Sequence, residues 1–151
     1  MYGKKVAIPR LQAWYGDSHT HYQYSGLQMS PMPWTQTLRA IKEDIEQQLQ
    51  TSFNSVLINL YRDGNDTVGW HSDDEPELGS EPVIASLSLG EIRDFQLKHK
   101  QLDKKVIVPL SSGSLFIMSG TTQSYWRHCI PRTKRVKSAR INLTFRRIVT
   151  S

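Results

Sequence analysis

Cysteine is almost absent from this sequence. Cys129 is the only cysteine among 151 residues, so the chain cannot form an internal disulfide bond. No apolar run approaches the roughly 20 residues that a helix needs to cross a bilayer, and no basic and apolar leader of the secretory type opens the sequence. We therefore expect a protein without membrane association in a reducing intracellular compartment, either the bacterial cytoplasm or the nucleus.

Acidic residues are missing from the last third of the chain. No Asp or Glu follows Asp103, whereas ten Lys or Arg do, and half of the fourteen acids lie between Asp63 and Glu81. A basic segment of this kind is typical of proteins that bind a polyanion, although a solubilising surface explains it too. We expect phosphate contacts from the basic residues clustered around His128, which are Arg127, Arg132, Lys134, Arg135 and Lys137.

The pattern of apolar residues predicts a mainly β protein. We expect one domain over residues 1–151, acting as a monomer. Turn-forming runs such as Asp63-Gly64-Asn65 and Ser111-Ser112-Gly113 separate short segments rich in β-branched and aromatic residues. Many short strands with regular turns indicate a sandwich or barrel. The predicted strands cover residues 56–61, 83–89, 95–99, 106–110, 114–118 and 139–148.

One helix is expected beside these strands. Pro31 and Pro33 are predicted to open it, because proline suits the first turn, and it should run to about Gln50. Its apolar residues recur at helical spacing and form a single stripe, so we interpret this flanking helix as a buttress on the sheet. Residues 1–30, rich in aromatic and turn-forming residues, are expected to form short strands that cover the substrate side.

Two histidines and an aspartate are candidate metal ligands. His71 and Asp73 are two residues apart, and His128 follows 57 residues after His71. Non-haem Fe(II) oxygenases hold iron with two His and one carboxylate and leave the remaining positions open. On an extended segment His71 and Asp73 point to the same face, which favours Asp73 over its neighbour Asp74. A His-Ser-Asp run by itself also occurs in ordinary surface loops.

The segment near the C-terminus alternates strictly between apolar and polar residues. Arg140, Asn142, Thr144 and Arg146 share one face of the predicted strand, within about 20 Å of one another. Two arginines on one face suit a ligand with a carboxylate at each end, because the planar guanidinium donates two parallel hydrogen bonds. The spacing is equally compatible with an edge strand that exposes a basic face to solvent.

These motifs together resemble the AlkB family of Fe(II)- and 2-oxoglutarate-dependent nucleic-acid dealkylases. The resemblance covers nearly the whole chain, and residues 9–17 and 24–26 are most similar to the DNA-repair branch of the family. It implies a double-stranded β-helix core, a jelly-roll type whose mouth holds the metal. The matching stretches are Asn59–Gly64, Trp70–Glu75, Ile84–Gly90, His128 and Arg140–Arg146.

The resemblance also implies a role for individual residues. His71, Asp73 and His128 would bind Fe(II). Arg140 would hold the far carboxylate of 2-oxoglutarate and Arg146 the carboxylate beside the keto group. Further hydrogen bonds to the same molecule would come from Asn59, Tyr61 and Asn142. Residues implied on the substrate side are Tyr22 and Tyr24 in the walls of the base pocket, Asp74 and Glu75 near the base, and Tyr2 in a finger that fills the gap left by an extruded base.

The reaction implied is the oxidative demethylation of 1-methyladenine or 3-methylcytosine in DNA. Fe(II) would be the cofactor. The co-substrates 2-oxoglutarate and O2 would be consumed, and formaldehyde, succinate and CO2 would be released. Because the target atom is hidden inside a duplex, the base must be extruded or already single-stranded. Three other functions stay open: an RNA demethylase, a protein hydroxylase on the same scaffold, and a non-catalytic nucleic-acid-binding module.

Overall fold

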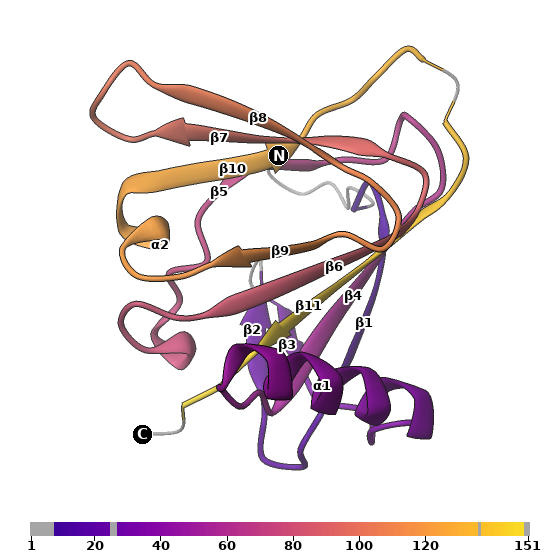
Figure 1. Cartoon of the computed structure of the whole chain (residues 1–151), viewed down its shortest axis with the longest axis vertical. Helices are drawn as coiled ribbons and strands as arrows, with labels where there is room; N and C mark the ends of the chain where they lie inside the picture. The colour runs from indigo at the N-terminus through magenta and orange to yellow at the C-terminus, as the bar shows by residue number, and fades with distance from the viewer. Residues whose placement is uncertain (1–7, 25–26, 136, 150–151) are drawn as a thin grey trace.

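Two antiparallel sheets face each other in this computed structural model (Figure 1). The structure describes residues 8–24, 27–135 and 137–149, and for residues 22–24 and 27–29 it describes the backbone alone. The larger sheet has the order β1-β4-β11-β6-β9, and its strands span Leu11–Gly16, Ser55–Tyr61, Arg140–Arg146, Ile84–Gly90 and Leu115–Met118. The smaller has the order β5-β10-β7-β8, spanning Val68–His71, Trp126–Ile130, Arg93–His99 and Lys105–Leu110. The mainly β prediction is confirmed.

All six predicted strands are present, with ends shifted by one or two residues. Strands β5 and β10 were not among them. Both are short, and both mix apolar residues with histidine and other polar residues, so neither shows the clean alternation that marks a half-buried strand. Strand β5 is stabilised by pairing with β10, and β10 also pairs with β7, which only the folded chain provides.

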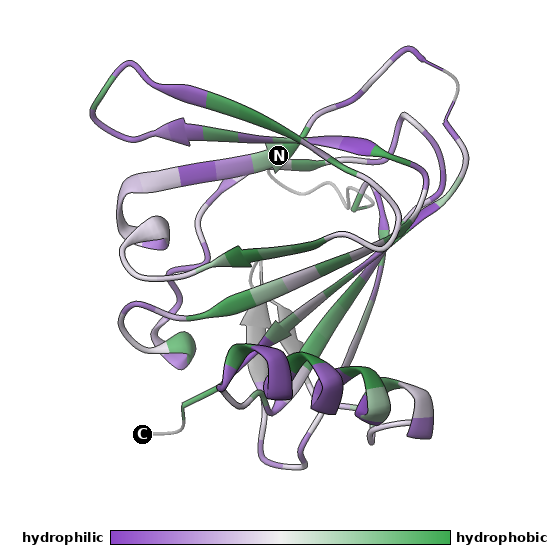
Figure 2. Ribbon diagram, viewed as in Figure 1, coloured by the Kyte–Doolittle hydropathy of each residue, from purple (hydrophilic) through white to green (hydrophobic). Residues whose placement is uncertain are grey.

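Two apolar clusters hold the layers together. The cluster between the two sheets joins Trp14 and Leu57 of the larger sheet to Phe95 and Leu97 of the smaller. The second cluster lies between the larger sheet and α1, which spans Gln36–Leu49, and includes Ile45 and Phe145. In Figure 2 the hydrophobic residues of β6, β9 and α1 stand out in green. The larger sheet is therefore covered on both faces.

Helix α1 begins later than predicted. Thr35 caps it by accepting a hydrogen bond from the backbone N–H of Leu38 at 3.1 Å. Pro33 lies before this cap, so its placement in the first turn was wrong. The reason is that the adjacent Met32 is tied to β1: its N–H donates to the Trp14 carbonyl, and its carbonyl accepts from the Gly16 N–H. The chain must leave this extended contact before a helix can start.

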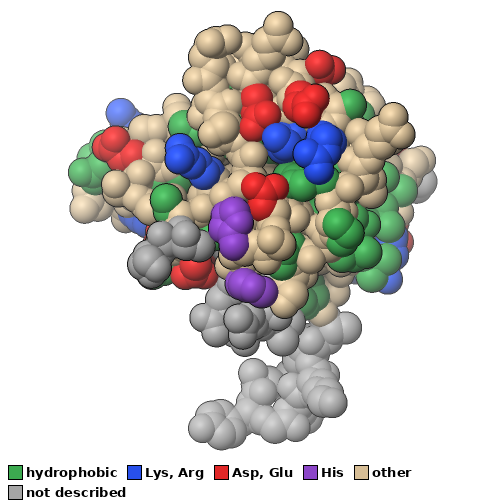
Figure 3. Space-filling view, turned by 90° about the horizontal axis from the view of Figure 1, so that it is seen from below, with side chains coloured by type: hydrophobic (Ala, Val, Ile, Leu, Met, Phe, Trp, Pro, Cys, Tyr) green, Lys and Arg blue, Asp and Glu red, His purple; other side chains and the backbone are tan. Residues whose placement is uncertain are grey.

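The outer face of α1 carries charges of both signs. Arg39, Glu43 and Asp44 are exposed on it. Lys42 and Glu46, one turn apart, form an ion pair at 3.0 Å and are only partly exposed. Figure 3 views the molecule from below and shows acidic and basic side chains close together on that face. This mixed surface supports the interpretation of α1 as a buttress. Among the described residues, no helix is long and apolar enough to cross a membrane.

The strands described before residue 30 divide between two parts of the fold. Strand β1 pairs with β4 and so belongs to the larger sheet. The hairpin of β2 (Tyr22–Tyr24) and β3 (Leu27–Met29) forms a separate two-stranded sheet. Short strands are thus present between Leu11 and Met29, and their role in a cover on the substrate side stays a prediction.

Arg93 ties together the segments that lead into β5 and out of β10. Its guanidinium is 3% exposed and donates to the carbonyls of Asp63 and Asp66, each at 3.0 Å, and of Pro131 at 2.8 Å. Burial lowers the pKa of Arg93, and the nearby Tyr61 and Asp66 oppose this effect. The three bonds hold the ends of the two strands that carry His71 and His128.

We expect Arg93→Met to lower the free energy of unfolding by about 2–3 kcal/mol, because three carbonyls lose the charged and buried donor that they share. Urea unfolding monitored by circular dichroism measures this loss. The matched control is Arg132→Met. Arg132 is exposed and its Nε donates to Asn65 Oδ1. We expect this variant to change the free energy of unfolding by no more than about 0.5 kcal/mol. Equal losses in both variants would contradict the role given to Arg93.

Candidate active site

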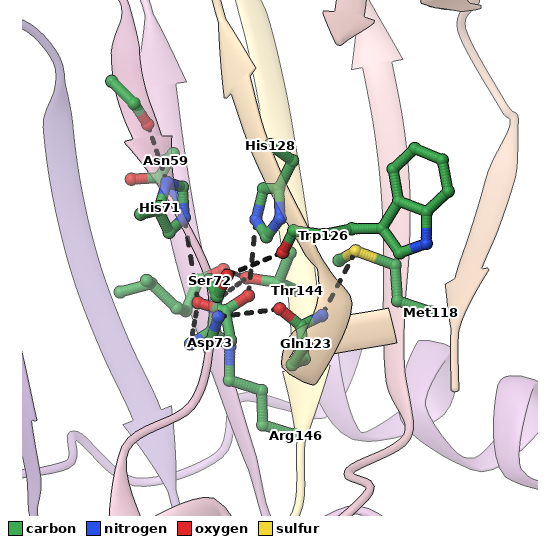
Figure 4. A network of polar contacts seen from close by, with 12 residues as sticks. Asn59, His71, Ser72, Asp73, Met118, Gln123, Trp126, His128, Thr144 and Arg146 are labelled. Carbon is green, nitrogen blue, oxygen red and sulfur yellow. Dashed lines mark hydrogen bonds and ion pairs between the residues drawn. The ribbon is translucent and has the colours of Figure 1, made fainter. Parts of the chain in front are cut away.

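Strand pairing brings the three candidate ligands together. His71 is the last residue of β5, and His128 lies directly opposite it on β10. Asp73 follows His71 by two residues, beyond the end of the strand. The pairing of β5 with β10 thus explains how side chains 57 residues apart meet at one point (Figure 4).

The geometry of this cluster suits a metal ion. One ligand atom from each of the three side chains lies within 4.8 Å of the others. His71 Nε2 is 3.8 Å from Asp73 Oδ1, and His128 Nε2 is 3.5 Å from Asp73 Oδ2. Asp73 is 1% exposed, whereas Asp74 is exposed to solvent. Of the two rival carboxylates, the structure therefore places Asp73 in the cluster.

His71 is held in the form that a metal requires. Its Nδ1 lies 2.7 Å from the Gly69 carbonyl, and an N–H at Nδ1 donates to that oxygen. The other nitrogen, Nε2, then carries the lone pair and faces Asp73. Burial lowers the pKa of His71, and the neighbouring His128 lowers it further, while Asp73 opposes them. A neutral imidazole is the form that binds a metal.

Asp73 is a buried but ionised carboxylate. Burial alone raises the pKa of Asp73, but the charge of Arg146, whose Nη1 is 3.5 Å from Oδ1, and the two histidines hold it well below the usual range. Its Oδ1 accepts no hydrogen bond from the described residues. A buried anionic oxygen with that capacity left is suited to a cation.

The polar face of β11 is buried. Strand β11 lies in the middle of the larger sheet, between β4 and β6, and Arg140, Asn142, Thr144 and Arg146 are all buried. The alternative of a solvated edge strand is therefore wrong. The opposite face is not uniformly apolar and buried, since Ile141 is 41% exposed.

Arg140 has donors available for a ligand. It is 1% exposed, its Nη2 donates to Ser88 Oγ at 2.9 Å, and its guanidinium lies 5.1 Å from the centre of the Tyr61 ring. Nε and Nη1 have no hydrogen-bond partner among the described residues. Burial lowers the pKa of Arg140, with the nearby Tyr61 opposing. A carboxylate is the group that satisfies two such donors at once.

Asn59 and Asn142 present different groups. Asn59 Oδ1 accepts from Arg10 Nε at 3.2 Å and from Gln12 Nε2 at 3.1 Å, which leaves its NH2 group as the donor for a ligand. The nitrogen of Asn142 donates to Ser86 Oγ and to the Leu87 carbonyl, so its amide oxygen remains. Asn59 therefore suits a carboxylate better than Asn142 does.

These side chains line a single cavity between the two sheets. The larger sheet contributes its polar face and the smaller sheet contributes the metal cluster. Apolar residues close the remaining walls. The cavity is lined by Leu57, Asn59, Tyr61, Val68, His71, Asp73, Ser86, Phe95, Leu110, Met118, His128, Ile130, Arg140, Asn142, Thr144 and Arg146.

The residues predicted on the substrate side are less well defined. Tyr22 and Tyr24 lie in β2, whose backbone pairs with β3, but their side chains are not among those described. Tyr2 lies outside the described residues. Asp74 is exposed, and Glu75 is half-buried at the start of a short 3-10 helix over Pro76–Leu78.

Several supporting residues were missed by sequence reasoning. Ser86 and Ser88 alternate with apolar residues along β6, and this period of two could have placed them opposite the polar face of β11. Gln12 lies on β1 and Arg10 just before it, and both side chains donate to Asn59 Oδ1. Gln123 accepts a hydrogen bond from the backbone N–H of Asp73. No local pattern in the sequence indicates this contact, because the two residues lie far apart in the chain.

A family model described as the 2OG-Fe(II) oxygenase superfamily matches residues 2–146. The chain belongs to this superfamily. The name of this superfamily refers to 2-oxoglutarate and Fe(II), in agreement with the cofactor and co-substrate that the resemblance implied. The His71, Asp73 and His128 cluster offers a metal-binding set, and the donors of Arg140 fit a carboxylate.

Curated relatives place the chain beside AlkB homologues. It is 45% identical over 150 residues to the mouse alpha-ketoglutarate-dependent dioxygenase alkB homolog 3, covering 93% of this chain and 52% of that protein. It is 43% identical over 157 residues to the human DNA oxidative demethylase ALKBH2, covering 99% of this chain and 60% of that protein. The resemblance to the AlkB family is confirmed, and the chain spans about half the length of the first of these relatives.

The fold is also shared with a solved structure. The structure of OsALKBH1 matches with a TM-score of 0.69 at 20% identity, covering 93% of this chain and 78% of that chain. At this identity the match shows the fold alone. With the family match, it confirms the predicted jelly-roll core.

We expect His71→Ala, Asp73→Ala and His128→Ala each to abolish Mn(II) binding and turnover without unfolding the domain, since each removes one of three ligands. Electron paramagnetic resonance measures the free Mn(II), and near-UV circular dichroism reports the fold. Asp74→Ala is the matched control, because this neighbouring carboxylate is exposed, and it should bind Mn(II) like the unchanged protein. Retained binding or repair in any of the three variants would refute the ligand assignment.

Proposed function

We propose that this protein removes methyl groups oxidatively from 1-methyladenine and 3-methylcytosine in DNA. The observation that carries the proposal is the convergence of a His-Asp-His cluster and a buried arginine with open donors on one cavity. The similarity to a DNA oxidative demethylase over 99% of this chain supports the choice of substrate.

The cofactor and co-substrate have defined places in this proposal. His71, Asp73 and His128 would hold Fe(II), and Arg140 would hold the far carboxylate of 2-oxoglutarate. When bound, Fe(II), 2-oxoglutarate and O2 supply the oxidation of an otherwise unreactive N-methyl C–H bond. In balance, one oxygen atom of O2 enters the methyl group and the other enters succinate, while 2-oxoglutarate loses CO2. The hydroxymethyl group then leaves the base as formaldehyde.

The chain's own residues bind, orient and exclude water. Arg140 and the NH2 group of Asn59 orient the co-substrate from the larger sheet. Arg146 lies 3.5 Å from Asp73 and balances its charge, and it would also hold the carboxylate beside the keto group. The apolar walls, which include Leu57 and Phe95, limit the access of water to the reacting atoms.

Nucleic acid would approach from the side of the basic residues. Arg127, Arg132, Lys134 and Arg135 are exposed, and three of them lie on the loop between β10 and β11 at the upper right of Figure 1. Lys137 is less available, because it lies 3.9 Å from Glu91. Phosphate contacts here would position a strand without reading its sequence. The β2–β3 hairpin, with Tyr22 and Tyr24, would wall the pocket for the base.

The proposal extends to the protein's setting. A DNA substrate and a buried free thiol at Cys129 both suit the nucleus or a bacterial cytoplasm. One domain with one complete cavity suits a monomer. Light scattering on a size-exclusion column measures the mass directly.

The co-substrate role of Arg140 makes a measurable difference. We expect Arg140→Met to raise the KM for 2-oxoglutarate by about tenfold or more, because a charge-assisted bond of about 1.5–3 kcal/mol is lost. Binding of an alkylated oligonucleotide should stay unchanged. Arg147→Met is the matched control, since Arg147 is exposed just beyond β11 and should leave the KM unaltered. A loss of DNA affinity with a normal KM would remove Arg140 from the co-substrate site.

The substrate class is tested by formaldehyde and succinate release. Oligonucleotides carrying 1-methyladenine or 3-methylcytosine are offered as single-stranded DNA, duplex DNA and RNA, together with a peptide mixture. We expect release from DNA in amounts equal to the base repaired, and none with Asp73→Ala. If RNA or peptide yields formaldehyde faster than DNA does, that molecule and not DNA is the substrate. Binding of an oligonucleotide without release of formaldehyde or succinate would indicate a non-catalytic module.

A further inference from the structure

The segment that carries Asp73 lies outside the strand ladders. Strand β5 ends at His71, and residues 72–73 have no regular secondary structure. Asp73 is nevertheless 1% exposed and lies in the candidate metal cluster. Something other than sheet pairing must fix the backbone at this position.

Two hydrogen bonds fasten this segment to the start of β10 (Figure 4). The backbone N–H of Asp73 donates to Gln123 Oε1 at 2.7 Å, and this bond is buried. The hydroxyl of Ser72 donates to the Trp126 carbonyl at 2.6 Å. Both acceptors belong to α2 (Thr122–Tyr125) or to the residue that follows it, and His128 comes two residues later.

Gln123 is itself held in place. It is 3% exposed, its Nε2 donates to Met118 Sδ at 3.4 Å, and its backbone carbonyl accepts from Lys100 Nζ at 3.2 Å. Its side chain therefore spans from β9 to the backbone of Asp73. Because both the oxygen and the nitrogen of this amide are hydrogen-bonded, the amide can hold the backbone of Asp73 in a fixed position.

The carboxylate of Asp73 depends on this support. Its contacts with Arg146, His128 and His71 are 3.5, 3.5 and 3.8 Å long, beyond the usual 2.7–3.2 Å of a strong N–H···O bond. Such contacts supply charge but little directional restraint. The direction in which the carboxylate points then follows mainly from where its backbone is fixed.

We propose that Gln123 and Ser72 are positioning residues for the Asp73 carboxylate, and that their two bonds set the metal affinity of the site. This inference rests on the proposed function, because it takes the cluster to be a metal site. The same short segment, residues 123–128, supplies one ligand and holds a second. A shift of α2 would therefore move Asp73 relative to His128 and weaken the metal site.

Metal binding without turnover tests this inference. Mn(II) is titrated into the metal-free protein and its free fraction is followed by electron paramagnetic resonance, at a temperature where every variant is folded. We expect Gln123→Met, which keeps the side chain's length but offers only a weak acceptor, to bind Mn(II) about tenfold more weakly. Ser72→Ala should bind roughly fivefold more weakly.

The matched control lies on the same helix. The hydroxyl of Thr122 donates to the Ser119 carbonyl at 2.6 Å, within its own turn, so Thr122→Ala removes a comparable bond without touching residues 72–73. We expect it to bind Mn(II) like the unchanged protein. Thermal unfolding of the metal-free proteins is measured in parallel, because a purely structural role lowers the melting temperature and leaves Mn(II) affinity intact.

The outcomes separate this inference from the proposed function. If the unchanged protein binds no Mn(II), the metal site fails and the positioning role fails with it. If the unchanged protein binds Mn(II) and Gln123→Met and Ser72→Ala bind equally well, only the positioning role is overturned. If Gln123→Met does not fold, Ser72→Ala decides, because Ser72 is only partly buried.

Discussion

A carboxylate enclosed between two sheets must be compensated by positive charge, and Asp73 imposes this requirement on the rest of the structure. Removing an ion from water costs several kcal/mol, so a buried carboxylate persists only with partners. Arg146 on β11 supplies that charge, and the histidines on β5 and β10 are polar neighbours of the same carboxylate. The arrangement of both sheets thus converges on one ionised side chain.

Strand β11 meets this requirement because its two faces have different surroundings. Leu143 and Phe145 pack toward α1 in one apolar cluster, while Arg140 and Arg146 face the cavity. Two buried guanidinium groups contribute little to stability by themselves. Arg146 contacts Asp73, whereas Arg140 keeps two donors without a hydrogen-bond partner among the described residues. Perturbed and buried charges that gather in one cavity are typical of functional sites.

The sequence predicted the elements with strong local patterns. The alternation in residues 139–148 gave a strand and the set of residues on its polar face, and the apolar stripe gave the helix. It could not tell whether the arginines faced solvent or a cavity, because alternation is identical for an edge strand and a central one. The predicted start of the helix was too early, because a proline in the sequence suits a first turn whether or not its neighbours are bonded elsewhere. In the fold the adjacent Met32 is bonded to β1, so the helix begins after it. Strand β5 escaped detection because its four residues have no clear period.

The kinds of chemistry available to this protein follow from its sequence alone. Two histidines, an aspartate and a pair of arginines are candidate ligands for a metal and a dicarboxylate, and the resemblance to a known family, more than their spacing, gave them these roles. The sequence favoured Asp73 over Asp74, whereas which donors of Arg140 stay open and how Gln123 reaches Asp73 were decided only by tertiary structure. The physical reason is that side-chain periodicity is a local property, whereas burial and hydrogen bonding depend on segments that meet only after folding. Residues separated by 50 positions in the chain, as Asp73 and Gln123 are, exchange a hydrogen bond that no local pattern records.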